Sequence, residues 1–124
     1  MITILVVDDD DAVRRSMVRL LKHAGFETLE ARDGSEAIHM FAGHSGAITA
    51  VTLDLAMPTT NGAETLAMLR AYAPRLPIIV ASAYPEPHDL PGRQPGDRGV
   101  GYLQKPFTAI ELTTEVERVI AEMK

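Results

Sequence analysis

The residues of this sequence that could do chemistry together lie at the ends of short apolar segments. They are two adjacent carboxylates, a third carboxylate, a hydroxyl and an amine: Asp8 and Asp9, Asp54, Ser82, and Lys105. If the apolar segments are parallel strands, their carboxyl ends meet at one edge of a sheet, which is where ligands bind in such sheets. We therefore expect the five side chains to converge on one site.

Three carboxylates at one edge of a sheet repel each other. Two unit negative charges 4 Å apart cost about 1 kcal/mol in water and about 4 kcal/mol at an effective dielectric constant of 20. A hard divalent cation relieves this repulsion, and Mg²⁺ typically binds a few carboxylates together with several waters. A carboxylate, Mg²⁺, an ammonium group and a hydroxyl suit phosphoryl transfer, with the carboxylate as nucleophile and the cations balancing the charge of the transferred group.

The apolar segments that precede these residues predict five short strands. The segment 2–7 is almost continuously apolar and rich in β-branched residues, as in a strand that is covered on both faces. The four further predicted strands comprise residues 26–31, 47–53, 77–81 and 100–104.

Helices are predicted between most of these strands. Apolar residues recur at helical spacing from Val13 to Ala24, with Arg14 and Arg15 between them, and Gly25 is placed to end that helix. Asp10 and Asp11, at its start, are expected to cap it rather than to do chemistry. Three further helices are predicted: at 36–41 after a turn at 33–34, at 63–72, and from a capping box at 108–111 onward.

Strands that alternate with helices predict a parallel sheet with helices on both faces. The chain has 124 residues, which fits one domain. We therefore expect a flavodoxin-like, doubly wound α/β domain over residues 1–124, with five parallel strands in the order 2-1-3-4-5.

The connection between the last two strands does not fit this pattern. Residues 85–101 include four prolines and four glycines among 17 positions. Proline inside a helix costs about 3 kcal/mol and glycine about 1 kcal/mol. We therefore expect a loop in place of the fourth helix of a doubly wound domain, and we leave its role open.

Composition and charge exclude several classes of protein. There is no cysteine, so disulfides and thiolate metal sites are excluded. The formal net charge is −5 and no basic run occurs, so we expect no direct nucleic-acid binding. No apolar stretch approaches the roughly 20 residues of a membrane span, and no signal peptide precedes the domain, so we expect a cytoplasmic protein that does not contact membranes.

Four pieces of the sequence resemble the receiver domains of two-component response regulators, the CheY-like family. They occur in the family's order and cover nearly the whole chain: ILVVDDD at 4–10, LDLAMP at 53–58 with NG at 61–62, VASA at 80–83, and GYLQKPF at 101–107. The resemblance implies a phosphorelay protein that is not a conventional enzyme. It implies that a sensor histidine kinase or a histidine phosphotransfer protein is the phosphoryl donor, and it does not identify the downstream partner.

The resemblance also implies a role for each acidic residue. Asp54 accepts the phosphoryl group. Asp9, Asp54 and the backbone carbonyl of Ala56 bind Mg²⁺, or Mn²⁺ in its place, and Asp8 acts mainly through a metal-bound water.

Three further residues take roles by the same resemblance. Lys105 pairs with Asp54 or with the phosphoryl group, and its peptide bond to Pro106 is expected to be cis. Ser82 donates its hydroxyl to a phosphoryl oxygen. Tyr102 is the switch aromatic, which reorients when Ser82 is drawn toward the phosphoryl group.

Two other functions remain open. The first is a protein-interaction module on the same fold that works without phosphorylation, which the atypical segment 85–101 mildly favours. The second is a Mg²⁺-dependent phosphohydrolase. Such an enzyme needs a general acid or base beside its nucleophile and a substrate pocket, and the sequence indicates neither.

Overall fold

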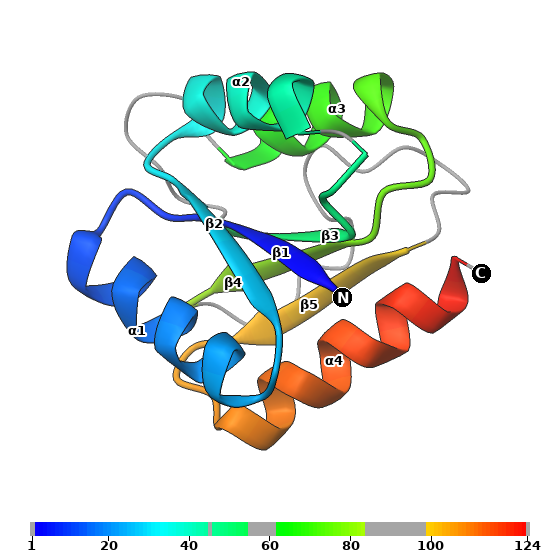
Figure 1. Ribbon diagram of the computed structural model, residues 1–124. Coiled ribbons are helices and arrows are strands. Elements are labelled where there is room, and N and C mark those ends of the chain that lie inside the picture. Colours follow the sequence, from blue (N-terminus) through cyan, green and yellow to red (C-terminus); the bar gives the residue numbers. More distant parts are fainter. Residues whose placement is uncertain (1, 45, 55–61, 84–98, 124) are drawn as a thin grey trace.

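Five parallel strands form one sheet at the centre of the computed structural model, which describes residues 2–44, 46–54, 62–83 and 99–123. The strand order is β2-β1-β3-β4-β5 (Figure 1). The strands are β1 (Thr3–Val7), β2 (Glu27–Ala31), β3 (Ala50–Asp54), β4 (Ile78–Ser82) and β5 (Val100–Gln104). This confirms the α/β class and the strand order that the sequence predicts.

Four helices cover the sheet in the described part of the chain. They are α1 (Asp11–His23), α2 (Gly34–His44), α3 (Gly62–Tyr72) and α4 (Ala109–Glu122). Helices α1 and α4 lie on one face, and α2 and α3 lie on the other (Figure 1). Within the same ranges, no helix combines the length and the apolar character that a membrane span requires. The predicted absence of a helix at 85–101 falls mainly on 84–98, outside the described residues.

Strand β1 is buried on both faces, as its continuous apolar sequence predicts. Ile4 and Val6 pack with α1 and α4, whereas Leu5 and Val7 pack with α2 and α3. All four residues are at most 1% exposed. Because both faces of β1 are packed, its carboxyl end cannot shift without disturbing two cores at once.

The ends of α1 and α4 follow the predicted capping chemistry. The Asp10 carboxylate accepts the Val13 N–H at 3.0 Å, which confirms Asp10 as the N-cap of α1. After α1 the chain turns at Gly25, whose φ of 99° is accessible to glycine at little cost. At α4 the hydroxyl of Thr108 and the carboxylate of Glu111 each accept the other residue's N–H, which confirms the capping box.

The predicted start of α2 is wrong by two residues. The sequence Asp-Gly at 33–34 predicts a turn, but Gly34 already belongs to the helix. The Asp33 carboxylate accepts the Glu36 N–H at 2.8 Å, and the Glu36 carboxylate accepts the Arg32 N–H at 3.0 Å. These bonds satisfy donors at the start of a helix, so Asp33 caps α2 instead of forming a separate turn.

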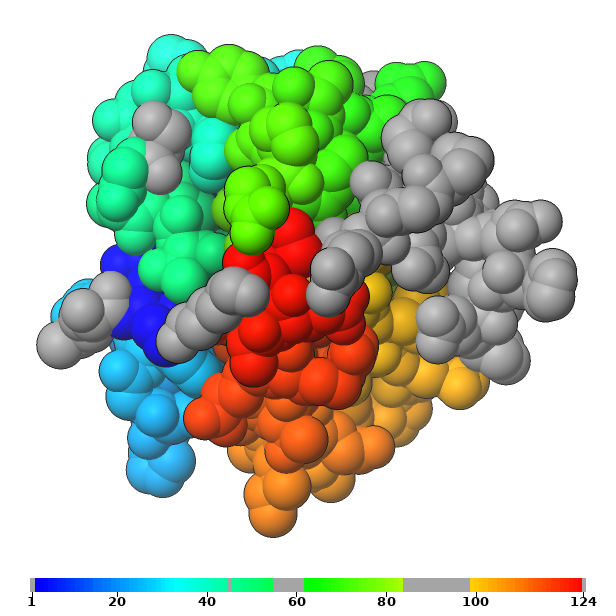
Figure 2. Space-filling view, turned by 90° about the vertical axis from the view of Figure 1, so that its right-hand side faces the viewer, coloured from blue at the N-terminus to red at the C-terminus, as the bar shows by residue number. Residues whose placement is uncertain are grey.

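Strand β5 is an edge strand, and α4 lies along it (Figure 2). The backbone N–H of Tyr102 donates to the Glu115 carboxylate at 3.0 Å, and that of Gly99 donates to the Glu122 carboxylate at 2.8 Å. Arg118 donates to both carboxylates, at 2.8 Å and 3.1 Å. Charged side chains of α4 therefore accept hydrogen bonds from backbone N–H groups in and just before β5. An edge strand would otherwise leave such groups free to pair with another chain.

The contact between Glu115 and β5 depends on pH. The hydrogen bond from Arg118 lowers the pKa of Glu115 below its ordinary value of 4.5, and it outweighs burial, which raises the pKa. The Tyr102 N–H also favours the ionised carboxylate. The stabilisation is therefore complete above about pH 4.5 and is lost as the pH falls through the lower pKa of the folded state.

Gly101 allows α4 to approach β5 this closely. A Cβ atom at position 101 would lie 2.6 Å from Cγ2 of Val119 and 2.5 Å from Oε2 of Glu115. Val119 is fully buried and Glu115 is bonded to Tyr102, so neither side chain can move away without losing contacts.

We expect Gly101→Ala to lower the free energy of unfolding by about 1–3 kcal/mol, the usual cost of overpacking a buried contact. Gly43→Ala is the matched control, because Gly43 lies in α2 and an added Cβ there would meet nothing within 4 Å. This control should be as stable as the wild type or slightly more so. Urea denaturation measures all three proteins, and equal stability of Gly101→Ala and the wild type would contradict the close approach.

Candidate functional site

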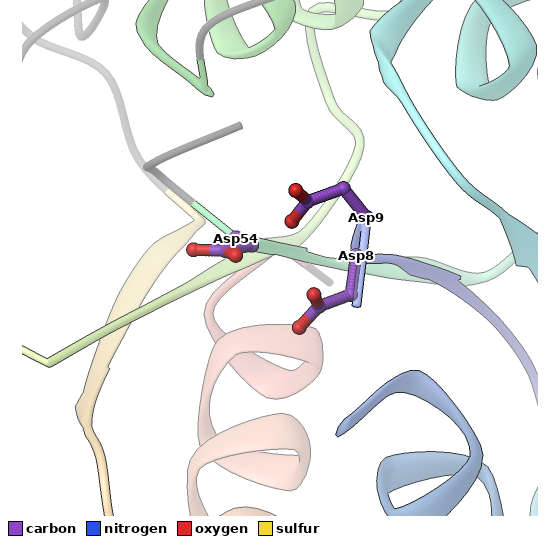
Figure 3. A group of neighbouring side chains, drawn as sticks. All are labelled: Asp8, Asp9 and Asp54. Carbon is purple, nitrogen blue, oxygen red and sulfur yellow. The ribbon is translucent and has the colours of Figure 1, made fainter. Parts of the chain in front are cut away.

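The carboxylates of Asp8, Asp9 and Asp54 meet at the carboxyl ends of two neighbouring strands (Figure 3). Asp8 directly follows β1 and Asp54 ends β3, and the pairing of Val7 with Leu53 brings the two strand ends level. One oxygen from each carboxylate lies within 4.8 Å of the other two. Among the described residues, no other group of His, Asp or Glu side chains converges in this way.

Lys105 brings a positive charge to this group. Its Nζ lies 3.5 Å from Oδ2 of Asp8 and 3.8 Å from Oδ2 of Asp54. The backbone N–H of Lys105 donates to the Ser82 carbonyl at 2.6 Å, which ties the chain after β5 to the end of β4. The Lys105–Pro106 peptide bond is cis, which confirms that expectation. The fold therefore places Lys105 beside carboxylates that lie far away in the sequence.

Asp8 is the most constrained of the three acidic residues. Its side chain is 5% exposed, and its carboxylate accepts the backbone N–H of Asp10 at 3.0 Å as well as the contact from Lys105. The backbone N–H of Asp8 donates to the carbonyl of Ala31 in β2 at 3.1 Å. Asp9, the next residue, is exposed. The site is thus rigid on the side of Asp8 and open to solvent at Asp9.

The donor set suits a hard divalent cation. In the described part of the chain, three carboxylates with three formal negative charges face the single ammonium group of Lys105. Mg²⁺ prefers oxygen ligands and keeps several waters, and the open side at Asp9 leaves room for them. The Ala56 carbonyl, implied as a ligand by the resemblance, belongs to residues 55–61, outside the described residues.

The two residues expected to form the switch come from neighbouring strands. Ser82 ends β4 and is buried, whereas Tyr102 is half-buried in β5 and packs against the core beneath α2 and α3. The sheet pairs Ser82 with Gln104, two residues beyond Tyr102. Their roles in switching stay predictions.

Sequence reasoning missed Arg14, which lies beside the site. The sequence places it among the charged residues between the apolar positions of α1, but it is 6% exposed, whereas Val13 is 36% exposed. Helical spacing could have revealed this, because Arg14 lies three and four residues before the buried Met17 and Val18. Burial lowers the pKa of Arg14, but hydrogen bonds to carboxylates outweigh it and raise the pKa overall.

The family that this geometry indicates is also found by comparison with known proteins. The model of the "Response regulator receiver domain" family matches residues 4–117. This chain belongs to that family. Receiver domains are signalling phosphoacceptors of two-component systems rather than catalytic enzymes, and they partner with histidine kinases.

Curated relatives of this receiver domain are longer proteins. The chain is 38% identical over 125 aligned positions to response regulator MprA of Mycobacterium tuberculosis, covering 99% of this chain and 52% of MprA. It is 36% identical over 119 positions to sensor kinase CckA of Brucella abortus, covering 95% of this chain and 12% of CckA. The chain therefore spans about half of MprA and a small part of CckA.

Solved receiver domains share the fold closely. The response regulator TrrA of Thermotoga maritima, solved in complex with Mg²⁺-BeF, is 32% identical with a TM-score of 0.82, over 96% of this chain and 99% of that one. The receiver domain of the hybrid histidine kinase CckA is 33% identical with a TM-score of 0.79, over 95% and 98%.

Asp9→Asn removes one of three mutually repelling charges at the exposed side of the site. In the absence of divalent metal, we expect this variant to be more stable than the wild type by about 1 kcal/mol, the repulsion of one carboxylate pair at 4 Å in water. Added Mg²⁺ should raise the melting temperature of the wild type but not that of the variant.

Asp10→Asn is the matched control, because asparagine preserves the N-cap of α1 and Asp10 is outside the group of three. This control should respond to Mg²⁺ as the wild type does. Differential scanning fluorimetry with Mg²⁺ and with EDTA measures these responses. Equal responses of Asp9→Asn and the wild type would contradict a metal site at these carboxylates.

Proposed function

We propose that Asp54 accepts a phosphoryl group from a phosphohistidine of a sensor histidine kinase or a histidine phosphotransfer protein. The observation that carries this proposal is the convergence of Asp8, Asp9 and Asp54 beside Lys105. Phosphoryl transfer to an aspartate needs a nucleophilic carboxylate, carboxylates that bind a cation, and a positive charge such as an ammonium group.

In this reaction an Asp54 oxygen forms a bond to phosphorus while the bond between phosphorus and the histidine nitrogen breaks. Lys105, whose Nζ lies 3.8 Å from the Asp54 carboxylate, balances negative charge on the nucleophile and on the transferred group. The hydroxyl of Ser82, buried at the end of the adjacent strand, donates a hydrogen bond to a phosphoryl oxygen. The chain contributes mainly positioning and charge balance, because this reaction needs little further covalent chemistry.

Asp9, Asp54 and the Ala56 carbonyl would hold Mg²⁺ at this site, and Asp8 would act through a metal-bound water. The ion would stabilise the charge on the phosphoryl oxygens, and Mn²⁺ could take its place. The TrrA structure, a relative in complex with Mg²⁺-BeF, supports this assignment.

The proposed output is a conformational change that a protein partner reads. Ser82 and Tyr102 act as the switch in this proposal, and residues 1–124 act as one receiver unit. The formal net charge of −5 and the absence of a basic run favour a protein partner over direct contact with nucleic acid.

Acetyl phosphate with Mg²⁺ should add one phosphoryl group to the wild-type protein, and peptide mapping by mass spectrometry should place it on Asp54. Asp54→Asn and the addition of EDTA should each abolish labelling. Asp33→Asn is the matched control, because it removes a carboxylate that caps α2 and should label as the wild type does.

Labelling of Asp54→Asn to the wild-type extent would show that another residue accepts the phosphoryl group. A wild-type protein that binds Mg²⁺ but is labelled neither by acetyl phosphate nor by a phosphorylated histidine phosphotransfer domain would instead favour the alternative, a protein-interaction module that works without phosphorylation.

A further inference from the structure

Arg14 is a buried cation whose three partners lie on three different segments. Its Nη2 donates to the Asp11 carboxylate in the first turn of α1 at 2.6 Å, and its Nε donates to the Glu30 carboxylate in β2 at 3.0 Å. Its Nη1 donates to the backbone carbonyl of Asp8 at 3.0 Å. The side chains of Asp11 and Glu30 are 61% and 44% exposed, so the Asp8 carbonyl is the buried partner of the three.

The bond to the Asp8 carbonyl orients the peptide that joins Asp8 to Asp9. The N–H of Asp8 is bonded to Ala31 in β2 and its carbonyl to Arg14 in α1, so the main chain of Asp8 is held on both sides. Its carboxylate is held by Lys105 and by a backbone N–H. Asp9 is exposed and directly follows this peptide, so a change in the peptide's orientation changes the direction of the Asp9 side chain.

We propose that Arg14 is a positioning residue of the cation site: by fixing the Asp8 carbonyl, it directs the Asp9 carboxylate toward Asp8 and Asp54. This inference rests on the proposed Mg²⁺ site. Residues that orient metal ligands without touching the metal change its affinity about 10- to 100-fold when they are replaced.

A role through charge alone predicts the opposite result. The guanidinium group of Arg14 is positive and repels a divalent cation, so its removal would strengthen Mg²⁺ binding if Arg14 acted only through its charge. If Arg14 positions Asp9, its removal weakens Mg²⁺ binding in spite of the added attraction. The sign of the change in affinity therefore separates the two roles.

Arg14→Met keeps an unbranched side chain, which is apolar and can stay buried, but it removes every hydrogen-bond donor of the arginine. We expect isothermal titration calorimetry to show Mg²⁺ affinity about tenfold weaker than in the wild type, at a temperature where circular dichroism shows both proteins folded. Arg15→Met is the matched control, because it removes the same charge from an exposed neighbouring position on α1. It should bind Mg²⁺ as tightly as the wild type or slightly more tightly.

Arg14→Lys is the second variant, and it decides the question if Arg14→Met does not fold. Lysine keeps the charge but cannot reproduce three bonds from one planar group, so Mg²⁺ affinity should fall here as well. In the metal-free proteins, the NMR shifts of the Asp8 carbonyl carbon and the Asp9 amide nitrogen should change in the Arg14 variants and stay unchanged in Arg15→Met.

The positioning role is overturned if folded Arg14→Met binds Mg²⁺ as tightly as the wild type or more tightly. Where only Arg14→Lys folds, the same result with that variant overturns it. Arg14 is then only part of a structural ion pair. Failure of the wild type to bind Mg²⁺ overturns the cation site itself. The two failures are therefore distinguishable.

Discussion

Three carboxylates whose oxygens lie within 4.8 Å of one another stay together only if the surrounding structure holds them there. Aspartates in a flexible loop would move apart, whereas Asp8 is buried and its main chain is bonded to both β2 and α1. Lys105 offsets part of the repulsion. Because Asp8 and Asp54 are held at neighbouring strand ends, movement of the exposed Asp9 cannot remove the repulsion between those two, and the site favours binding of further positive charge.

Hydrophobic packing sets the geometry of these charges. Strand β1 is covered on both faces, so its position is determined by two cores rather than by a local turn. Its register with β3 places the residue after Val7 beside the residue after Leu53. A shift of one residue would reverse the faces of a strand, so the apolar contacts that fix the register also bring Asp8 and Asp54 together.

Helix α4 has a comparable role for Lys105. The lysine follows β5, an edge strand paired on one side only. On the other side Glu115 of α4 bonds to Tyr102 in the strand, and Glu122 bonds to Gly99 just before it. This contact requires glycine at position 101. Arg14 on α1 bonds to the Asp8 carbonyl, and Glu115 on α4 bonds to the strand that precedes Lys105. Both helices lie on the same face of the sheet, although neither residue belongs to the pieces of sequence that resemble the family.

Local features could be predicted from the sequence alone. These are the five strands, the capping residues Asp10 and Thr108, and the polar residues at the strand ends. Such features depend on residues that are close in the chain. The start of α2 was missed because Asp-Gly is compatible with both a turn and a helix N-terminus. Only the tertiary structure decided that Arg14 bonds to Glu30 and to the Asp8 carbonyl, that α4 binds the edge of β5 and that Lys105 contacts Asp8 as well as Asp54. Each of these contacts joins residues whose proximity depends on how whole helices and strands pack.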